Sequence, residues 1–258
     1  MATKIHHLNC GVLHTPPNPR ASCHCLLIED ANGLALVDTG IGLQDVADPL
    51  ERIGQPTIDA AGFQFDETNT AVRQIERLGF QAHEVKHVLL THGDPDHAGG
   101  LADFPAAAVH ASEEELAGVR GGHWRYSPPQ FAHGPRWKAH PASTARWFGL
   151  EARSVALGFE SEVLLIPLFG HTPGHCGVAV GQDVRWMLHV GDAYYLRVEL
   201  TTDDHPVSAL AAQRADNDAL RRQSLDHLRR LARDHPEVEM LGYHDFTEFP
   251  ATASGDAP

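Results

Sequence analysis

His92-Gly93-Asp94-Pro95-Asp96-His97 is the stretch that decides the fold, because it places four metal-binding side chains within six residues. Gly93 and Pro95 keep the segment from continuing as a helix or strand, so a loop is predicted. Imidazole and carboxylate groups suit zinc, iron or manganese, whereas structural zinc sites more often use thiolates. The spacing favours one loop that contacts two metal ions. The alternative interpretation is a solvated acidic loop.

Strands and helices are expected to alternate on both sides of this loop. The predicted strands are 25–30 and 34–38, joined by an Asn-Gly turn, then 87–91, 163–167, 177–180, 186–190 and 238–243. Helices are predicted at 70–78, from Ser112 onward and at 215–233. The spacing in the last helix predicts four inward-facing residues: Leu220, Leu225, Leu228 and Leu231.

Five polar positions, one of them His92 of this loop, follow predicted strands directly or after a short turn. They are Asp38, His92, His171, Asp192 and His244. Loops at the ends of rigid strands are where a fold can fix chemical groups while it tolerates variation. We therefore expect these side chains to gather at one edge of a sheet stack.

The order of these residues resembles the metallo-β-lactamase superfamily, whose loop reads His-x-His-x-Asp-His. The other motifs match at Leu36-Val37-Asp38-Thr39-Gly40, at Gly170-His171-Thr172-Pro173-Gly174-His175, at Gly191-Asp192 and at His244. The resemblance covers roughly residues 5 to 249. It implies an α/β protein with a single αββα sandwich domain over 1–250 and the metals at one sheet edge.

By analogy with this family, two divalent ions are expected. The resemblance implies that the first ion binds His92, Asp94 and His171, the second binds Asp96, His97 and His244, and Asp192 bridges both. Asp94 departs from the family, which has His there. If Asp94 coordinates, the first site shifts toward harder ions; if it cannot reach, that site is weakly filled. Zinc is favoured, with iron or manganese as alternatives.

Three further residues receive roles from this resemblance. Asp38 is expected to accept a hydrogen bond from a ligand imidazole or from the loop, although a simple turn residue is the alternative. Asp96 is expected to accept a proton during the reaction. Tyr195 lies three residues after Asp192, as in family lactonases, and could hydrogen-bond the oxyanion. Tyr194 is the alternative for that role, and a packed aromatic pair is the competing interpretation.

An aromatic stretch at 120–149 is interpreted as an insertion that forms a lid over an apolar substrate. Its candidate pocket residues are Trp124, Tyr126 and Trp137, with Tyr194 from the later loop. A homodimer interface or an auxiliary core is the alternative. The tail from Ala251 to Pro258 is expected to be disordered.

Charge and cysteine content limit the possible partners. The 20 Lys and Arg against 34 Asp and Glu give a formal charge of −14, which disfavours nucleic acid and anionic lipid. No stretch has the length and apolarity of a membrane span. The four cysteines lack a C-x-x-C pair, so reduced thiols in the cytoplasm are expected.

The expected function is therefore metal-dependent hydrolysis of an ester-type bond in a small molecule, by a metal-bound hydroxide. An acyl-homoserine lactone is the favoured substrate, and β-lactams, phosphoesters and thioesters are the alternatives. A diiron redox protein is a competing hypothesis, because that branch of the family also has a carboxylate at the position of Asp94. That branch carries a flavin domain, for which this chain has no room. A binding protein without catalysis ranks last, since only one ligand is altered.

Overall fold

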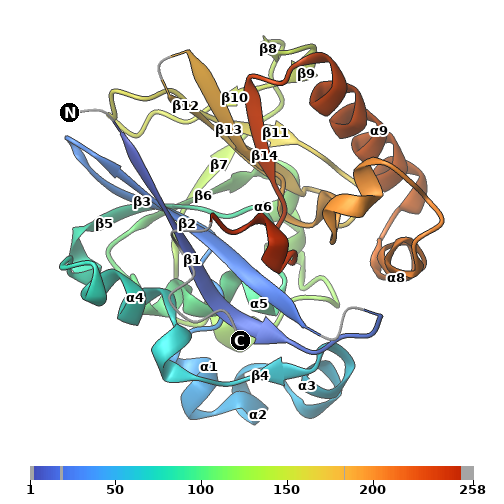
Figure 1. The fold of residues 1–258 in the computed structure, drawn as a ribbon. Helices are drawn as coiled ribbons and strands as arrows, with labels where there is room; N and C mark the ends of the chain where they lie inside the picture. Colours follow the sequence, from blue (N-terminus) through green and yellow to red (C-terminus); the bar gives the residue numbers. More distant parts are fainter. Residues whose placement is uncertain (1–2, 18–19, 183, 251–258) are drawn as a thin grey trace.

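The computed structural model describes residues 3–17, 20–182 and 184–250. The segment 251–258, for which the sequence predicts a disordered tail, lies outside the described residues. Two β-sheets lie face to face, and helices cover their outer sides (Figure 1). The predicted αββα sandwich is therefore confirmed. No helix of the described part of the chain is both long and apolar enough to cross a membrane.

The sheets are built from strands of both halves of the chain. The seven-stranded sheet runs in the spatial order β4 (Phe63–Gln64), β1 (Lys4–Leu13), β2 (Ala21–Asp30), β3 (Gly33–Val37), β5 (Val85–Leu89), β6 (Ala108–Ser112) and β7 (Arg136–His140). The five-stranded sheet runs in the order β10 (Arg153–Ser154), β11 (Val163–Pro167), β12 (Cys176–Gln182), β13 (Arg185–His189) and β14 (Val238–Leu241). A small hairpin pairs β8 (Arg146–Trp147) with β9 (Leu150–Glu151).

Helices connect and cover these strands. They are α1 (Leu43–Ala47), α2 (Pro49–Arg52), α3 (Gln55–Ala61), α4 (Ala71–Arg77), α5 (Pro95–Ala98), α6 (Glu113–Gly121), α7 (Pro128–Phe131), α8 (Pro206–Arg214) and α9 (Asp218–Asp234). Short 3-10 turns occur at η1 (Glu67–Asn69), η2 (Ala82–Glu84), η3 (Gly99–Asp103), η4 (Gly191–Ala193), η5 (Arg197–Leu200) and η6 (Phe246–Glu248).

Strand β2 shows how the sequence builds the layers. Its run Leu26-Leu27-Ile28 is apolar at every position because both faces of the strand are buried. Leu26 and Ile28 belong to the core between the two sheets, together with Leu165 of β11. Leu27 points the other way, into the core beneath the helices on the first sheet. Successive side chains of one strand thus join two different cores.

The long helix α9 covers the second sheet through one apolar stripe. Leu225, Leu228 and Leu231 are buried there and belong to the same core as Leu188 of β13. The prediction that Leu220 also faces inward is wrong, since this side chain is 40% exposed. Arg221, one position later, takes the inward place, because the i, i+3, i+4 spacing of the stripe leads back to it.

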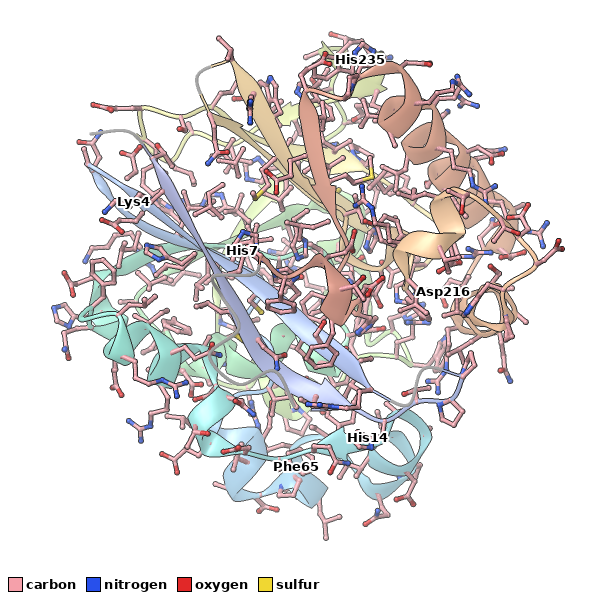
Figure 2. The ribbon with its side chains drawn as sticks, in the orientation of Figure 1. Lys4, His7, His14, Phe65, Asp216 and His235 are labelled. Carbon is pink, nitrogen blue, oxygen red and sulfur yellow. The ribbon has the colours of Figure 1, made fainter. Side chains whose placement is uncertain are left out.

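The stretch 120–149 contains regular structure. Strand β7 pairs in parallel with β6 at the edge of the seven-stranded sheet, and Trp137 packs against the core beneath that sheet. The loop that follows α6 approaches the connection between α8 and α9. There, His123 Nε2 lies 3.3 Å from an oxygen of Asp216, which Figure 2 labels. This part of the chain therefore reaches toward the C-terminal half of the molecule.

Candidate metal centre

Strand ends from both sheets converge on one buried group of side chains. His92 follows β5, His171 follows β11 and Asp192 lies in η4, directly after β13. Asp38 follows β3, and His244 follows β14. All five side chains are buried. The structure thus brings together, at one edge of the sandwich, residues that lie more than 200 positions apart in the chain.

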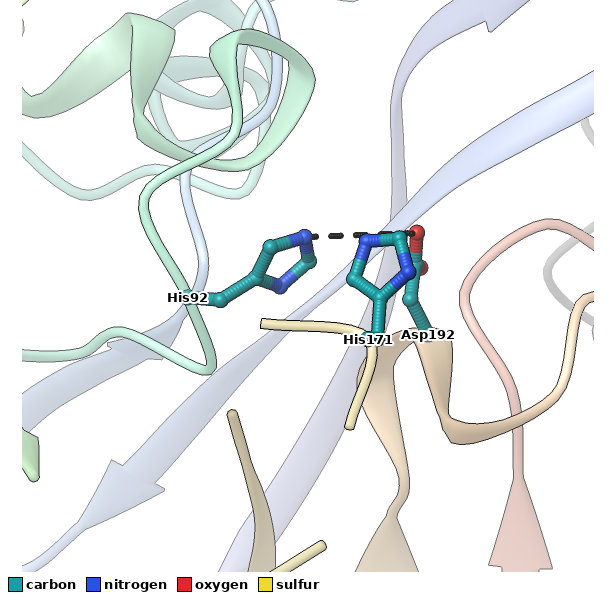
Figure 3. Close-up of side chains that lie close together, drawn as sticks. All are labelled: His92, His171 and Asp192. Atoms are coloured by element: carbon teal, nitrogen blue, oxygen red, sulfur yellow. Dashed lines mark ion pairs between the residues drawn. The ribbon is translucent and has the colours of Figure 1, made fainter. Parts of the chain in front are cut away.

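His92, His171 and Asp192 form the first cluster, in which one ligand atom of each lies within 4.8 Å of the others. The Nε2 atom of His171 is 3.4 Å from Oδ2 of Asp192, and Nε2 of His92 is 4.0 Å from the same oxygen. Figure 3 shows the two rings directed toward the carboxylate. This spacing leaves a common point that a single cation could share.

Asp96, His97 and His244 form the second cluster, with the same mutual limit of 4.8 Å. Asp192 also borders this cluster, because its Oδ1 lies 3.3 Å from His97 Nε2 and its Oδ2 lies 3.2 Å from His244 Nε2. One carboxylate therefore stands between both clusters. Such an arrangement is suited to bridge two ions.

Buried atoms without hydrogen-bond partners show that these residues fit cations. Within the described residues, Nε2 of His92, Nε2 of His97 and Oδ1 of Asp192 have no hydrogen-bond partner. A buried polar atom without a partner is costly, and native proteins rarely leave one unexplained. Imidazole nitrogens with carboxylate oxygens match the ligands of zinc, iron and manganese. The two clusters are therefore chemically fit for divalent metal ions.

Hydrogen bonds on the far side of three rings direct their lone pairs inward. His97 Nδ1 donates to Asp38 Oδ2 at 2.9 Å, and His244 Nδ1 donates to the Ser22 carbonyl oxygen at 2.8 Å. Thr91 Oγ1 gives its proton to Asp38, so it accepts from His92 Nδ1 at 3.1 Å. With each Nδ1 protonated, each Nε2 offers a lone pair to the cluster.

His175 positions Asp192 without belonging to either cluster. Its Nδ1 donates to the Leu168 carbonyl oxygen at 3.0 Å, and its Nε2 accepts from the backbone N–H of Asp192 at 2.9 Å. Burial lowers the pKa of His175 to about 3, so the ring stays neutral and can accept this bond. The second His of the Gly-His-Thr-Pro-Gly-His turn thus supports the carboxylate between the clusters.

Asp94 belongs to neither cluster and instead pairs with Arg125. The Nε of Arg125 donates to Asp94 Oδ1 at 2.9 Å, and one terminal nitrogen of the guanidinium donates to Oδ2. Burial opposes ionisation of this carboxyl, but the adjacent Arg125 holds its pKa well below the usual range. Asp94 Oδ2 remains 3.4 Å from His92 Nε2 and 3.2 Å from His171 Nε2.

Two side chains that contact the residues around the clusters were not predicted from the sequence, Arg125 and Glu115. Glu115 is buried and accepts from the Gly93 N–H at 2.8 Å and from the Thr172 hydroxyl at 2.6 Å. Glu115 thereby links the loop formed by residues 92–97, called here the metal loop, to the turn that carries His171. Burial raises the pKa of Glu115 to about 7. The only sequence signal was the helix start at Ser112, whose hydroxyl does cap the Glu115 N–H.

An open pocket leads to both clusters, with Asp192, Asp96 and His244 among its lining residues. Its polar lining is Thr15, Asp94, Asp96, Arg125, Asp192, Tyr195, Arg214 and His244. Its apolar lining is Leu13, Ala21, Ala61, Val207 and Leu210. Small-molecule sites usually combine apolar lining with a few polar groups. This pocket has both kinds of lining, named below the apolar wall and the polar floor.

The predicted aromatic residues have different places relative to this pocket. Tyr195 lines it, and its ring stands edge-on to His244 at a centroid distance of 5.2 Å. Tyr194 points elsewhere and donates its hydroxyl to Glu248 at 2.9 Å. Trp124 is 79% exposed, while Tyr126 lies behind the metal loop and donates its hydroxyl to Glu115. The lining of this pocket includes neither these three residues nor Trp137.

The neighbouring groups shift the pKa values of Asp96 and Asp192, the two carboxylates of the clusters, in opposite directions. Burial raises the pKa of Asp96, and the charge of Asp192 acts in the same direction. Burial has the same tendency at Asp192, but His244 and His97 hold its pKa well below the usual range. The carboxylate between the clusters is therefore the more strongly ionised of the two.

Fold and site together define an αββα protein with two adjacent His/Asp clusters, each able to hold a metal ion, at the edge of the sandwich. The family model of the metallo-beta-lactamase superfamily matches residues 18–243, and the chain belongs to this family. The resemblance inferred from the motifs is thus confirmed.

Relatives in sequence agree with this membership. A protein named probable metallo-hydrolase from Mycobacterium tuberculosis is 42% identical over 201 residues, which are 75% of this chain and 63% of that protein. The chain thus spans less than two thirds of the length of this relative. A protein named N-acyl homoserine lactonase from Agrobacterium fabrum is 30% identical over 155 residues, or 58% of this chain and 56% of the lactonase.

Solved structures share the fold at lower identity. An N-acyl homoserine lactone hydrolase, solved with N-hexanoyl-L-homoserine at its catalytic metal centre, superimposes with a TM-score of 0.73 at 19% identity over 96% of each chain. An AiiA variant of B. thuringiensis with N-decanoyl-L-homoserine at its active site gives 0.74 at 20% identity, again over 96% of each chain. At this identity the likeness shows the common fold.

Proposed function

We propose that this chain is a metal-dependent hydrolase that cleaves an ester-type bond, with a lactone of the acyl-homoserine class as the favoured substrate. The observation that carries the proposal is the position of Asp192 between two His/Asp clusters on the floor of a pocket with an apolar wall. β-Lactams, phosphoesters and thioesters are competing substrates for the same kind of site. The four cysteines are free, which supports a reducing location in the cytoplasm.

The proposed cofactor is a pair of divalent ions, zinc being favoured and iron or manganese being the alternatives. His92, His171 and Asp192 would hold one ion, and Asp96, His97, His244 and Asp192 the other. When bound, such a pair acts as a Lewis acid and makes water a nucleophile at neutral pH. The protein then contributes orientation, since the rings of His92, His97 and His244 are fixed by hydrogen bonds at Nδ1.

Two pocket residues would act on the reacting groups directly. Asp96 reaches the pocket from the metal loop, where its carboxylate can take the proton of the attacking water. Tyr195 reaches the pocket from the segment after η4, where its hydroxyl can donate a hydrogen bond to the developing oxyanion or to the leaving alkoxide. No covalent intermediate with the protein is required.

The apolar wall supports a substrate with an acyl chain. Leu13, Val207 and Leu210 line the pocket beside the polar floor. An acyl chain on this wall would leave the lactone ring near Asp192 and Tyr195. The names of two relatives agree with this substrate class, because one sequence relative is named a lactonase and one structural neighbour holds an N-acyl homoserine product.

The proposal is tested by elemental analysis of the purified protein together with a substrate panel. Lactones, β-lactams, phosphoesters and thioesters are assayed with the zinc-loaded protein. Turnover of lactones above the other classes supports the proposal. Preferred turnover of another class would show that the proposed substrate is wrong. Bound iron with visible absorbance and no ester turnover would show that the protein is a redox protein and not a hydrolase.

A further inference from the structure

The guanidinium of Arg125 contacts both Asp94 and His171, beside the first cluster. Its Nε and one terminal nitrogen both donate to the Asp94 carboxylate. The same terminal nitrogen lies 2.9 Å from Nε2 of His171. The same Nε2 lies 3.2 Å from Asp94 Oδ2, so it either accepts from the guanidinium or donates to the carboxylate, depending on the tautomer of the ring. In either tautomer, the His171 Nε2 that would face a metal ion is therefore engaged by the Arg125–Asp94 pair.

This arrangement distinguishes His171 from the other three imidazoles. In His92, His97 and His244 the Nδ1 atoms are bonded and Nε2 faces a cluster. In His171, Nδ1 has no hydrogen-bond partner among the described residues, and Nε2 contacts both Arg125 and Asp94. The ring is oriented by Arg125 instead of by a bond on its far side.

The charge of Arg125 offsets the charge that Asp94 adds. Asp94 stands where the family has a neutral imidazole, so it brings one extra negative charge to the first cluster. Arg125 brings one positive charge and is buried against that carboxylate. In a buried site such charges interact far more strongly than in water. The Arg125–Asp94 pair therefore has no net charge that would attract a cation. Both Asp94 oxygens already accept hydrogen bonds from Arg125.

Other contacts hold Arg125 in this position. Its remaining terminal nitrogen donates to the carbonyl oxygen of Arg214, at the end of α8. Two residues earlier, His123 meets Asp216 beyond the end of the same helix. The guanidinium thus has partners on three sides, from the metal loop, the His171 turn and α8.

We propose that Arg125 competes with the metal ion of the first cluster, so that the two sites fill in order: the Asp96, His97 and His244 site tightly, and the His92 and His171 site weakly. This inference rests on the proposed function. One imidazole lone pair cannot accept a hydrogen bond from a guanidinium and coordinate an ion at the same time. Binding of the second ion therefore requires Arg125 to leave His171. Arg125 is in this sense a positioning residue that sets metal occupancy.

The test is a zinc titration of the metal-free protein by calorimetry, with elemental analysis after dialysis. The wild type is expected to show one tight and one weaker site, at least about tenfold apart, and to keep about one zinc after dialysis. Arg125→Gln removes the competing charge and frees Asp94, so the weak site should tighten by about tenfold or more, with about two zinc ions retained. Arg125→Lys keeps the charge without the fork and should give an intermediate affinity.

Arg214→Gln is the matched control. It removes the same charge from the same pocket, while the backbone carbonyl that binds Arg125 remains, so the two zinc affinities should stay unequal. Two equally tight sites in the wild type, or an unchanged weak site in the Arg125 variants, would overturn the inference. If Arg125→Gln does not fold, Arg125→Lys decides. Unequal zinc sites without turnover of any ester-type substrate would refute the proposed function instead, and no zinc binding would refute both.

Discussion

Nδ1 of His97 lies 2.9 Å from Oδ2 of Asp38, and this hydrogen bond turns Nε2 of the same ring toward Asp192. Asp38 is wholly buried and also accepts from the backbone N–H and the hydroxyl of Thr91. Its backbone is in the left-handed region, with φ of 55°. The carboxylate is thus held in place by the strand end itself, and it in turn fixes a ring of the second cluster.

Loss of this carboxylate should weaken metal binding. Asp38→Asn leaves a side chain of similar size whose charge no longer supports the His97 ring, so zinc affinity of the second cluster should fall about 10- to 100-fold. Zinc titration measures this change. Asp30→Asn is the control, because Asp30 also ends a strand but binds Asn32 and Thr3 far from the clusters. Equal zinc affinity in Asp38→Asn and wild type would show that Asp38 is only a turn residue.

Removal of the proposed proton acceptor should abolish turnover. Asp96→Asn loses both the proton acceptor and a carboxylate of the second cluster, so we expect kcat to fall by about 10²- to 10⁴-fold or more. His171→Ala removes a ring of the first cluster and should also abolish hydrolysis. Circular dichroism should show a retained fold in both variants. Activity that survives both changes would refute the site assignment.

The two adjacent tyrosines should separate catalysis from stability. Tyr195→Phe removes a hydroxyl from the pocket and should lower kcat for lactones by about 10²-fold, with zinc content unchanged. Tyr194→Phe removes the hydroxyl that donates to Glu248, so it should lower the free energy of unfolding by about 1 kcal/mol and leave kcat unaltered. Equal kcat in Tyr195→Phe and wild type would show that Tyr195 contributes only to packing.

Stability should fall in mild acid because of a row of histidines across three parallel strands. His110 Nε2 lies 3.1 Å from His87 Nδ1, and its own Nδ1 lies 2.9 Å from His140 Nε2. Burial, reinforced by the charges of His140 and His87, lowers the pKa of His110 to about 3. Below the unfolded-state pKa of about 6.5, protons bind the unfolded chain preferentially, so stability is lost as the pH falls toward the folded value.

The expected size of this effect is about 2 kcal/mol between pH 8 and pH 5. Urea unfolding at a series of pH values measures it, and the comparison is with His110→Leu. That variant can have a different stability at every pH, but its slope below about pH 6.5 should be smaller than that of the wild type. Identical slopes in the two proteins would contradict the role of His110.

The sequence could predict the sandwich and its ligand residues because their signals are local. Each of the residues Asp38, His92, His171, Asp192 and His244 follows an apolar strand, and strand ends on one side of a stack meet. Glu115 and Arg125 could not be found this way. Their partners Gly93 and Asp94 lie 22 and 31 positions away in the chain, and no periodic pattern encodes such contacts.

Short elements were also difficult to predict. Strand β6 is buried along its whole length and carries His110 and Ser112, so it has neither the alternation of a half-buried strand nor an uninterrupted apolar run.

Helix α9 was predicted, but its inward stripe includes Arg221, which is buried and paired with Asp218 at 2.6 Å. Hydrophobic periodicity assigns such a position to its apolar neighbour, Leu220. A buried arginine with an ion-pair partner is thus misread by a pattern that counts only apolar residues.

The most direct test of the central claim is the rate of lactone hydrolysis before and after removal of metal. The protein is treated with a chelator, dialysed and restored with zinc, and turnover of an N-acyl homoserine lactone is followed by the acid released. We expect the chelated protein to be inactive, zinc to restore turnover, and zinc to raise the melting temperature because it binds the folded chain. Lactone hydrolysis that persists at the same rate in the metal-free protein would contradict the account.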